Sequence, residues 1–81
     1  MKHARKDYDR IQDPDELIPD DEPVFLLRGQ DVLAPELLRH WAVQLLLNGG
    51  SGVMAEMVIW HAREMEDWQK EHKQKLPDLP A

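Results

Sequence analysis

The chain of 81 residues contains no cysteine, which excludes disulfide bonds and thiolate metal sites. The absence of cysteine fits a reducing cytosol. No apolar run approaches the roughly 20 residues that a membrane-spanning helix needs. Residues 1–10 also lack the apolar core of a signal peptide. Together these absences predict a soluble, cytoplasmic protein.

Basic residues are scarce, with ten Lys and Arg against 16 Asp and Glu, for a net charge of -6. An acidic chain without a basic helix is a poor partner for duplex nucleic acid, so a nucleic-acid-associated regulator is the least supported alternative. Catalytic motifs are lacking too: the sequence has no Gly-rich phosphate loop, no HExxH and no serine elbow. We therefore predict no catalytic residue, no cofactor, no metal and no enzymatic activity.

Large apolar side chains are abundant for so short a chain, with three Trp and four Met beside many Leu. A single domain of this size has a small core and needs help from a partner. We therefore expect a homo-oligomer. The single domain, 1–81, is predicted to comprise the following parts: an arm and acidic loop (1–23), an extended segment and turn (24–31), a helical hairpin (32–73) and a tail (74–81).

The predicted fold is mainly α, an antiparallel helical hairpin preceded by a short extended or β segment. Apolar periodicity indicates helices at 32–47 and 52–73, separated by Asn48–Gly52, with Ser51 capping the second helix. A short loop makes the two helices antiparallel neighbours.

Residues at equal height on the hairpin should have numbers that sum to about 101. This register places Trp41 level with Trp60, and His40 level with His61. These four residues would form one belt across the hairpin. We interpret this belt as two packed Trp rings with the His rings at the edge of the core. A ligand pocket walled by Trp, and a metal site built on the two His, are the alternatives.

The segment Val24–Arg28 reads as a strand, but no second strand is evident. It should therefore pair with its copy in another subunit or run as extended chain across the helices. Gly29 permits a positive φ, and Asp31 is a suitable N-cap for the following helix. A helix N-terminus beside Arg28 and Gln30 is a plausible anion site, although Asp31 would itself occupy the helix donors.

The N-terminal arm offers two further candidate ligand residues. Tyr8 and Ile11 would share one side of a helical turn, either as a frayed end clipped to the body or as an arm that closes over a ligand. In the second case Tyr8 would stack on the ligand and Arg10 would pair with a phosphate or carboxylate. The loop 13–23, with three prolines, is expected to be acidic and solvated, and the tail to be mobile.

Several segments resemble a group of short proteins encoded by tailed bacteriophages and prophages. The resemblance covers roughly residues 3–42 and rests on Tyr8–Asp13, on Ile18–Asp31 with its IPDDEPVFLLRGQD string, on Ala34–Glu36 and on Trp41–Ala42. It implies a phage accessory protein in the bacterial cytoplasm, and it implies no activity, cofactor or catalytic residue.

Two functional hypotheses follow from the sequence. The first is a non-enzymatic binder of a small anionic, nucleotide-type ligand, with a counter-defence sponge as one form of this role. Its ligand-binding residues are Tyr8, Arg10, Arg28, Gln30, Asp31 and Trp41. The second is a protein–protein interaction module or inhibitor that uses surplus apolar surface to dock on a host or phage protein.

Overall fold

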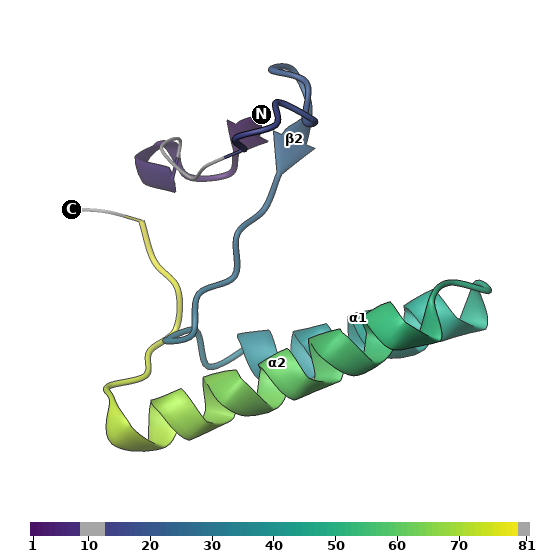
Figure 1. The fold of residues 1–81 in the computed structure, drawn as a ribbon. Coiled ribbons are helices and arrows are strands. Elements are labelled where there is room, and N and C mark those ends of the chain that lie inside the picture. Colours follow the sequence, from purple (N-terminus) through teal and green to yellow (C-terminus); the bar gives the residue numbers. More distant parts are fainter. Residues whose placement is uncertain (9–12, 80–81) are drawn as a thin grey trace. The chain divides into compact units, whose positions relative to one another are not determined.

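The computed structural model describes residues 1–8 and 13–79 (Figure 1). Ile11 and Arg10 lie outside the described residues. The chain divides into two compact units, one formed by Met1–Leu27 with Asp78–Ala81 and the other by Arg28–Pro77. The fold is mainly helical with two packed helices, as the sequence predicts, and it also contains a short parallel strand pair. No described helix is both long enough and apolar enough to cross a membrane.

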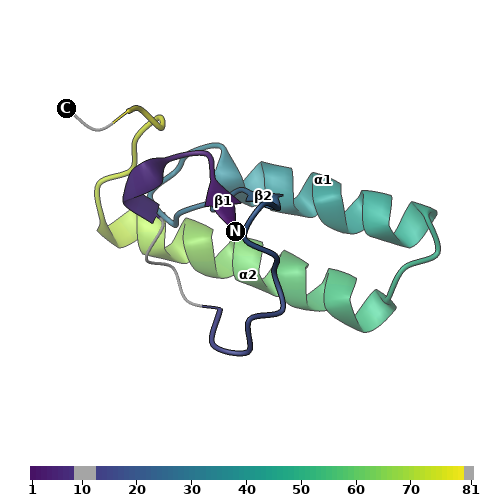
Figure 2. The same ribbon diagram turned by 90° about the horizontal axis from the view of Figure 1, so that it is seen from above.

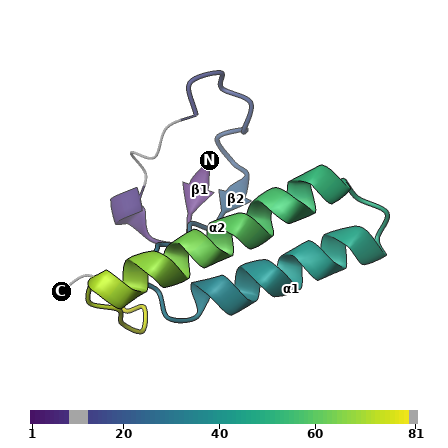
Figure 3. The ribbon, with the colours of Figure 1, turned by 60° about the horizontal axis from the view of Figure 1, so that its bottom comes forward.

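The unit Arg28–Pro77 is a helical hairpin of α1 (Ala34–Leu47) and α2 (Gly52–Glu71). The helices run side by side in opposite directions, joined by a tight turn (Figures 1, 2 and 3). The predicted hairpin is therefore confirmed. α1 begins two residues later than predicted, and α2 ends two residues earlier.

The turn between the helices has the backbone that its glycines predict. Gly49 adopts a φ of +77°, a left-handed conformation that ends α1 at little cost for glycine. A Cβ atom on Gly50 would collide with the Leu45 side chain and lie 2.9 Å from the Leu45 carbonyl oxygen. The Ser51 hydroxyl then accepts a hydrogen bond from the Met54 N–H, 3.1 Å long, which confirms Ser51 as the N-cap of α2.

The core of the hairpin is a seam of small side chains. Among the described residues, the buried apolar side chains of the two helices are Ala34, Pro35 and Ala42 of α1, and Ala55, Ala62 and Met65 of α2. Alanine lets two helix backbones approach closely, so there is no room between them for large rings. Most of the large apolar side chains are consequently left at the surface of the hairpin.

The N-terminal unit contains β1 (Lys2–His3), a 3-10 helix, η1 (Lys6–Tyr8), and β2 (Pro23–Val24). β1 and β2 pair in parallel, with Lys2 opposite Pro23 and His3 opposite Val24. The expectation that the extended segment finds no strand in its own chain is therefore wrong. A strand of two residues has no alternation to detect in the sequence, and only the first residue of the predicted strand, Val24, takes part in the pairing.

The acidic loop of the same unit is organised by Asp13. Its carboxylate accepts hydrogen bonds from the N–H groups of Leu17 and Ile18, at 3.3 and 2.9 Å. Asp13 is half-buried, whereas Asp15, Glu16 and Asp20–Glu22 are exposed. The loop is thus acidic and largely solvated, with one carboxylate used to close a turn.

Candidate interaction surface

The segment just before α1, a candidate anion site in the sequence, contributes hydrogen bonds that hold the hairpin unit together. Asp31 is 8% exposed, and its carboxylate accepts a hydrogen bond of 2.8 Å from the Leu33 N–H. The N-cap position itself is Leu33, which makes no side-chain cap. Asp31 therefore closes the turn before the helix and is not its N-cap, because Pro35 sets the helix start two residues later than expected.

Gln69 fastens this turn to α2. Its side-chain amide donates to the carbonyl oxygens of Gly29 and Asp31, at 2.9 Å each. The backbone of Lys75 adds a bridge: its N–H donates to the Gln30 carbonyl, and its own carbonyl accepts from the Val32 N–H. Lys75, assigned to the tail from the sequence, is thus part of the hairpin unit.

Gly29 permits a positive φ but does not adopt one. Among the described glycines a positive φ occurs at Gly49. A Cβ atom on Gly29 would meet the Trp68 ring at 3.9 Å, which is an ordinary van der Waals contact. The turn is held by hydrogen bonds from Gln69 and Lys75, so a left-handed backbone at Gly29 is not required.

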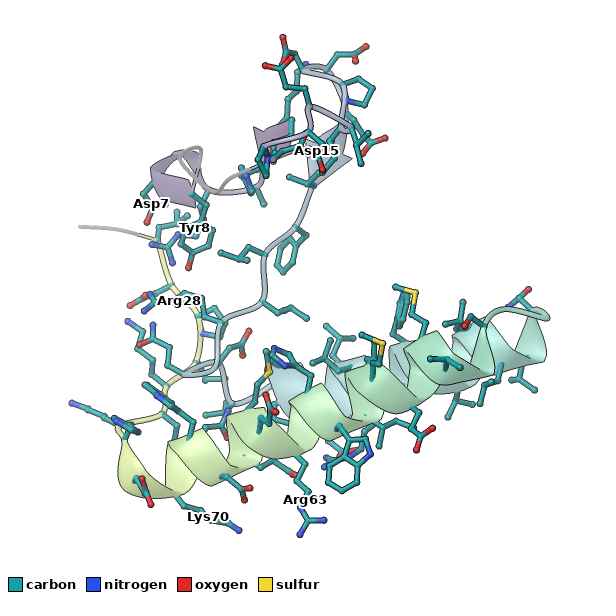
Figure 4. All side chains as sticks on the ribbon, in the orientation of Figure 1. Asp7, Tyr8, Asp15, Arg28, Arg63 and Lys70 are labelled. Carbon is teal, nitrogen blue, oxygen red and sulfur yellow. The ribbon has the colours of Figure 1, made fainter. Side chains whose placement is uncertain are left out.

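The structure distributes the predicted ligand residues over both units. Tyr8 belongs to the N-terminal unit, where the Arg5 guanidinium lies 4.7 Å from its ring centroid and the His3 ring meets it edge-on. Arg28, Gln30, Asp31 and Trp41 belong to the hairpin unit. Of these, Arg28 is exposed (Figure 4) and Asp31 is buried in the turn.

Trp41 lies two helical turns into α1, about 10 Å along the axis from its start. Trp41 is therefore on the helix, whereas Arg28 and Gln30 precede it.

A hollow in the N-terminal unit is lined by Met1, Asp13, Glu16, Ile18, Pro19 and Asp20. Three of these side chains are carboxylates, so the hollow does not suit an anionic ligand. Within residues 1–8 and 13–79, no three His, Asp or Glu side chains come together in a way that could hold a metal ion.

The belt of mirrored Trp and His residues is not a core. Trp41 is 43% exposed and Trp60 is 56% exposed. Trp41 lies one residue before the buried Ala42, about 100° around α1, and Trp60 lies two residues before Ala62, about 200° around α2. The alanine seam therefore occupies the position predicted for the rings, and the Trp60 ring instead faces the Arg63 guanidinium at 5.6 Å.

An ion pair across the hairpin identifies its two faces. The Arg39 guanidinium bonds both oxygens of the Glu66 carboxylate, one of them at 3.0 Å, and also contacts Glu36 at 2.8 Å. On α1, Arg39 shares a side with Val43 and Leu46; on α2, Glu66 shares a side with Ile59 and Arg63, both by spacings of i, i+4, i+7. We call this the ion-pair face: Arg39, Val43, Leu46, Ile59, Arg63 and Glu66.

The other side of the alanine seam is mainly apolar, and its acidic residue is Glu64, which is spaced i+7 from Met57 and contacts His61. It combines Leu37 and Trp41 of α1, spaced i, i+4, with a row on α2 spaced i, i+3, i+7, i+14. We call it the Met–Trp face, and its residues are Leu37, Trp41, Met54, Met57, His61 and Trp68. All six are exposed, the five apolar ones between 42% and 65%. Figure 4 shows sulfur atoms on the side of α2 opposite Arg63 and Lys70.

Electrostatics distinguish the two faces as well. Hydrogen bonds from Arg39 lower the pKa of the Glu66 carboxyl below its ordinary value, and those to Glu66 and Glu36 raise the pKa of Arg39. On the Met–Trp face the titratable group is His61, whose ring nitrogen lies 3.2 Å from the Glu64 carboxylate at the edge. The ion-pair face suits water, whereas the Met–Trp face suits an apolar surface.

Comparison with known proteins places the chain in no family: no family model, no curated protein and no solved structure matches it.

Proposed function

We propose that this protein is a non-enzymatic protein–protein interaction module, and that the Met–Trp face is where its partner docks. Together with the resemblance in the sequence, this gives a phage accessory protein that acts by binding rather than by catalysis. The single observation that supports it is the unusual distribution of side chains in the hairpin. Small residues fill the seam, and large apolar residues lie outside it on a mainly apolar face, with Glu64 beside His61.

The exposed residues are of the types that dominate the energetics of protein interfaces. Tryptophan and methionine are enriched in interface cores, where charged residues are depleted. Met54 and Met57 add flexible side chains that adapt to an opposing surface. The spacing of the row on α2 matches the way in which a helix presents anchors to a groove or to another helix.

Site-specific photo-crosslinking in expressing cells tests the proposal. A photoreactive amino acid at position 54 should form a discrete adduct with a protein, because this side chain is on the Met–Trp face. The matched control is position 46 on the ion-pair face, since Met54 is 48% exposed and Leu46 is 50% exposed. If neither position, or position 46 alone, yields a protein adduct, the proposed role is wrong.

The second candidate is the small-anion binder, and one observation favours it. Arg28 presents an exposed guanidinium beside the turn before α1, in a chain with a net charge of -6. Calorimetric titration with nucleotides and cyclic nucleotides tests it, with Arg28→Ala as the variant that should lose binding and keep its fold. No heat of binding at millimolar ligand would contradict it.

A further inference from the structure

We infer that the partner on the Met–Trp face is a second copy of this chain, so that two hairpins form an antiparallel four-helix bundle around that face. The inference rests on the proposed function, because it uses the same surface. It names the occupant, which the proposed function leaves open. The buried residues of the bundle would be Leu37, Trp41, Met54, Met57, His61 and Trp68 from each copy.

The first argument is that the hairpin needs a permanent cover. Among the described residues of the two helices, four alanines, one proline and one methionine are buried, and no large side chain is fully buried. Domains below about 70–80 residues usually need disulfides, a metal or oligomerisation. Cysteine is absent from the sequence, and no metal cluster forms within the described ranges. Another copy of the chain is always present wherever the protein is made.

Charge is the second argument. The protein carries a net charge of -6, so most contacts between two copies would bring like charges together. The residues that define the Met–Trp face are five apolar side chains and His61, and the neighbouring Glu64 carboxylate contacts the His61 ring at 3.2 Å. Pairing this face with itself therefore brings fewer like charges together than a contact through the acidic loop or the ion-pair face. A twofold interface uses the same patch on both copies, and an apolar patch is complementary to itself.

The area of the face is the third argument. α1 and α2 contain 14 and 20 residues, which makes them about 21 Å and about 30 Å long. Two helices about 10 Å wide each then present a flat footprint on the order of 500 Å². The protruding Trp and Met side chains increase the accessible area above this flat value. A standard interface buries about 800 Å² per partner.

The orientation of the bundle follows from the same geometry. With the two Met–Trp faces inward, Arg39 and Glu66 of both copies lie on the outside, in water. The alanine seams then hold each hairpin together, and the Trp and Met side chains form a shared core between the hairpins. Each helix of the bundle would thereby bury a wide apolar stripe, as the helices of four-helix bundles do.

Thiol labelling of single-cysteine variants tests the arrangement, since the natural chain has no cysteine. Met54→Cys and Leu46→Cys are matched, because the two side chains are 48% and 50% exposed in a single chain and both lie near the loop. We expect a maleimide to label Met54→Cys at least tenfold more slowly than Leu46→Cys in concentrated protein. Dilution below the dissociation constant should remove the difference. Equal rates at all concentrations, or slower labelling of Leu46→Cys, would overturn the inference.

Light scattering coupled to size-exclusion chromatography gives a second readout. The full chain should have twice the mass of one 9.5 kDa chain, and Trp41→Glu should halve it. Val43→Glu, on the same helix and with a side chain 50% exposed, should leave the mass unchanged. A folded monomer would overturn the inference. A monomer whose position 54 still crosslinks to a different protein would overturn the second copy and leave the proposed function standing.

Discussion

Two glycines in the hairpin turn should respond in opposite ways to replacement by alanine: one replacement should lower stability and the other should not. Gly49→Ala places a Cβ atom on a backbone with a φ of +77°, and should cost about 1 kcal/mol of folding free energy. Gly52→Ala adds its methyl group at the first residue of α2 in open space, and should be neutral or stabilising by about 0.5 kcal/mol. Urea denaturation of both variants measures the difference. Equal stabilities would show that the turn is not held in this conformation.

Gln69 is the residue whose side chain joins the turn to α2, and removing it should be costly. Gln69→Ala loses two hydrogen bonds and leaves the carbonyls of Gly29 and Asp31 without that donor. We expect a loss of about 1–3 kcal/mol in the free energy of unfolding. The control Gln44→Ala removes an exposed amide from α1 and should change stability by less than about 0.5 kcal/mol. Equal effects in the two variants would contradict the role of Gln69.

At this scale the sequence predicts local roles well and distant partners poorly. Ser51 was predictable because a cap and its helix are neighbours in sequence. Gln69 was missed, although it stands seven residues after Ala62 and fourteen after Ala55, as the polar member of a row of small residues. A polar residue in a row of small apolar residues was the signal that could have identified Gln69. Its acceptors, Gly29 and Asp31, lie about 40 positions away, and no local rule connects them.

The two helices are joined by the Arg39–Glu66 ion pair, which makes the hairpin sensitive to acid. Arg39 lowers the pKa of Glu66 below about 4.5, so its contribution to stability is complete above that pH and is lost as the pH falls through the lowered value. Glu66→Gln should therefore lower the melting temperature at pH 7 by a small amount, because the pair is partly exposed. The difference from the natural chain should shrink on acidification and vanish once Glu66 is protonated.

Thermal unfolding followed by circular dichroism between pH 7 and pH 2 checks this expectation. Glu56→Gln is the matched control, because it removes a carboxylate from the same helix and leaves the pair intact. A difference for Glu66→Gln that persists to the lowest pH would contradict an electrostatic cause.

For whole elements, periodicity predicts the long ones and fails for the short ones. The two helices and their antiparallel order follow from apolar spacing and from the Asn48–Gly52 stop. β1 has two residues, which is too few for any pattern, and it pairs across about 20 residues of sequence with β2. The predicted packing of Trp41 and Trp60 as core is wrong for another reason: equal height on a hairpin does not determine which side of each helix faces the seam.

The assembly as a whole should melt at a temperature that depends on concentration. If two copies share one core, unfolding is coupled to dissociation, and a tenfold dilution costs about 1.4 kcal/mol. For two chains of this length we expect a fall in melting temperature of about 3–6 °C per tenfold dilution. Calorimetry across a hundredfold range of concentration measures this directly. A constant melting temperature would mean that a single chain folds alone.

At the scale of the molecule, the sequence predicts surplus apolar surface but not where it lies. Composition alone indicates that three Trp and four Met exceed what one hairpin can bury. Choosing between two faces required the Arg39–Glu66 pair, since it shows which rows of α1 and α2 lie on the same side of the seam. Which rows share a side depends on how each helix is rotated about its axis. The small residues determine this rotation, because they are the ones that allow the two backbones to approach.

The alanine seam has a consequence for the protein inside a cell. Because the large apolar side chains lie on the surface of each hairpin, chaperones and proteases would recognise a newly made, unpartnered copy as they recognise a misfolded chain. If the partner is a second copy, survival of the chain would then rise with the local supply of new copies, and translation of several copies from one message would favour prompt pairing. A weakly expressed gene would yield mostly degraded protein, whereas a strongly expressed one would accumulate abruptly.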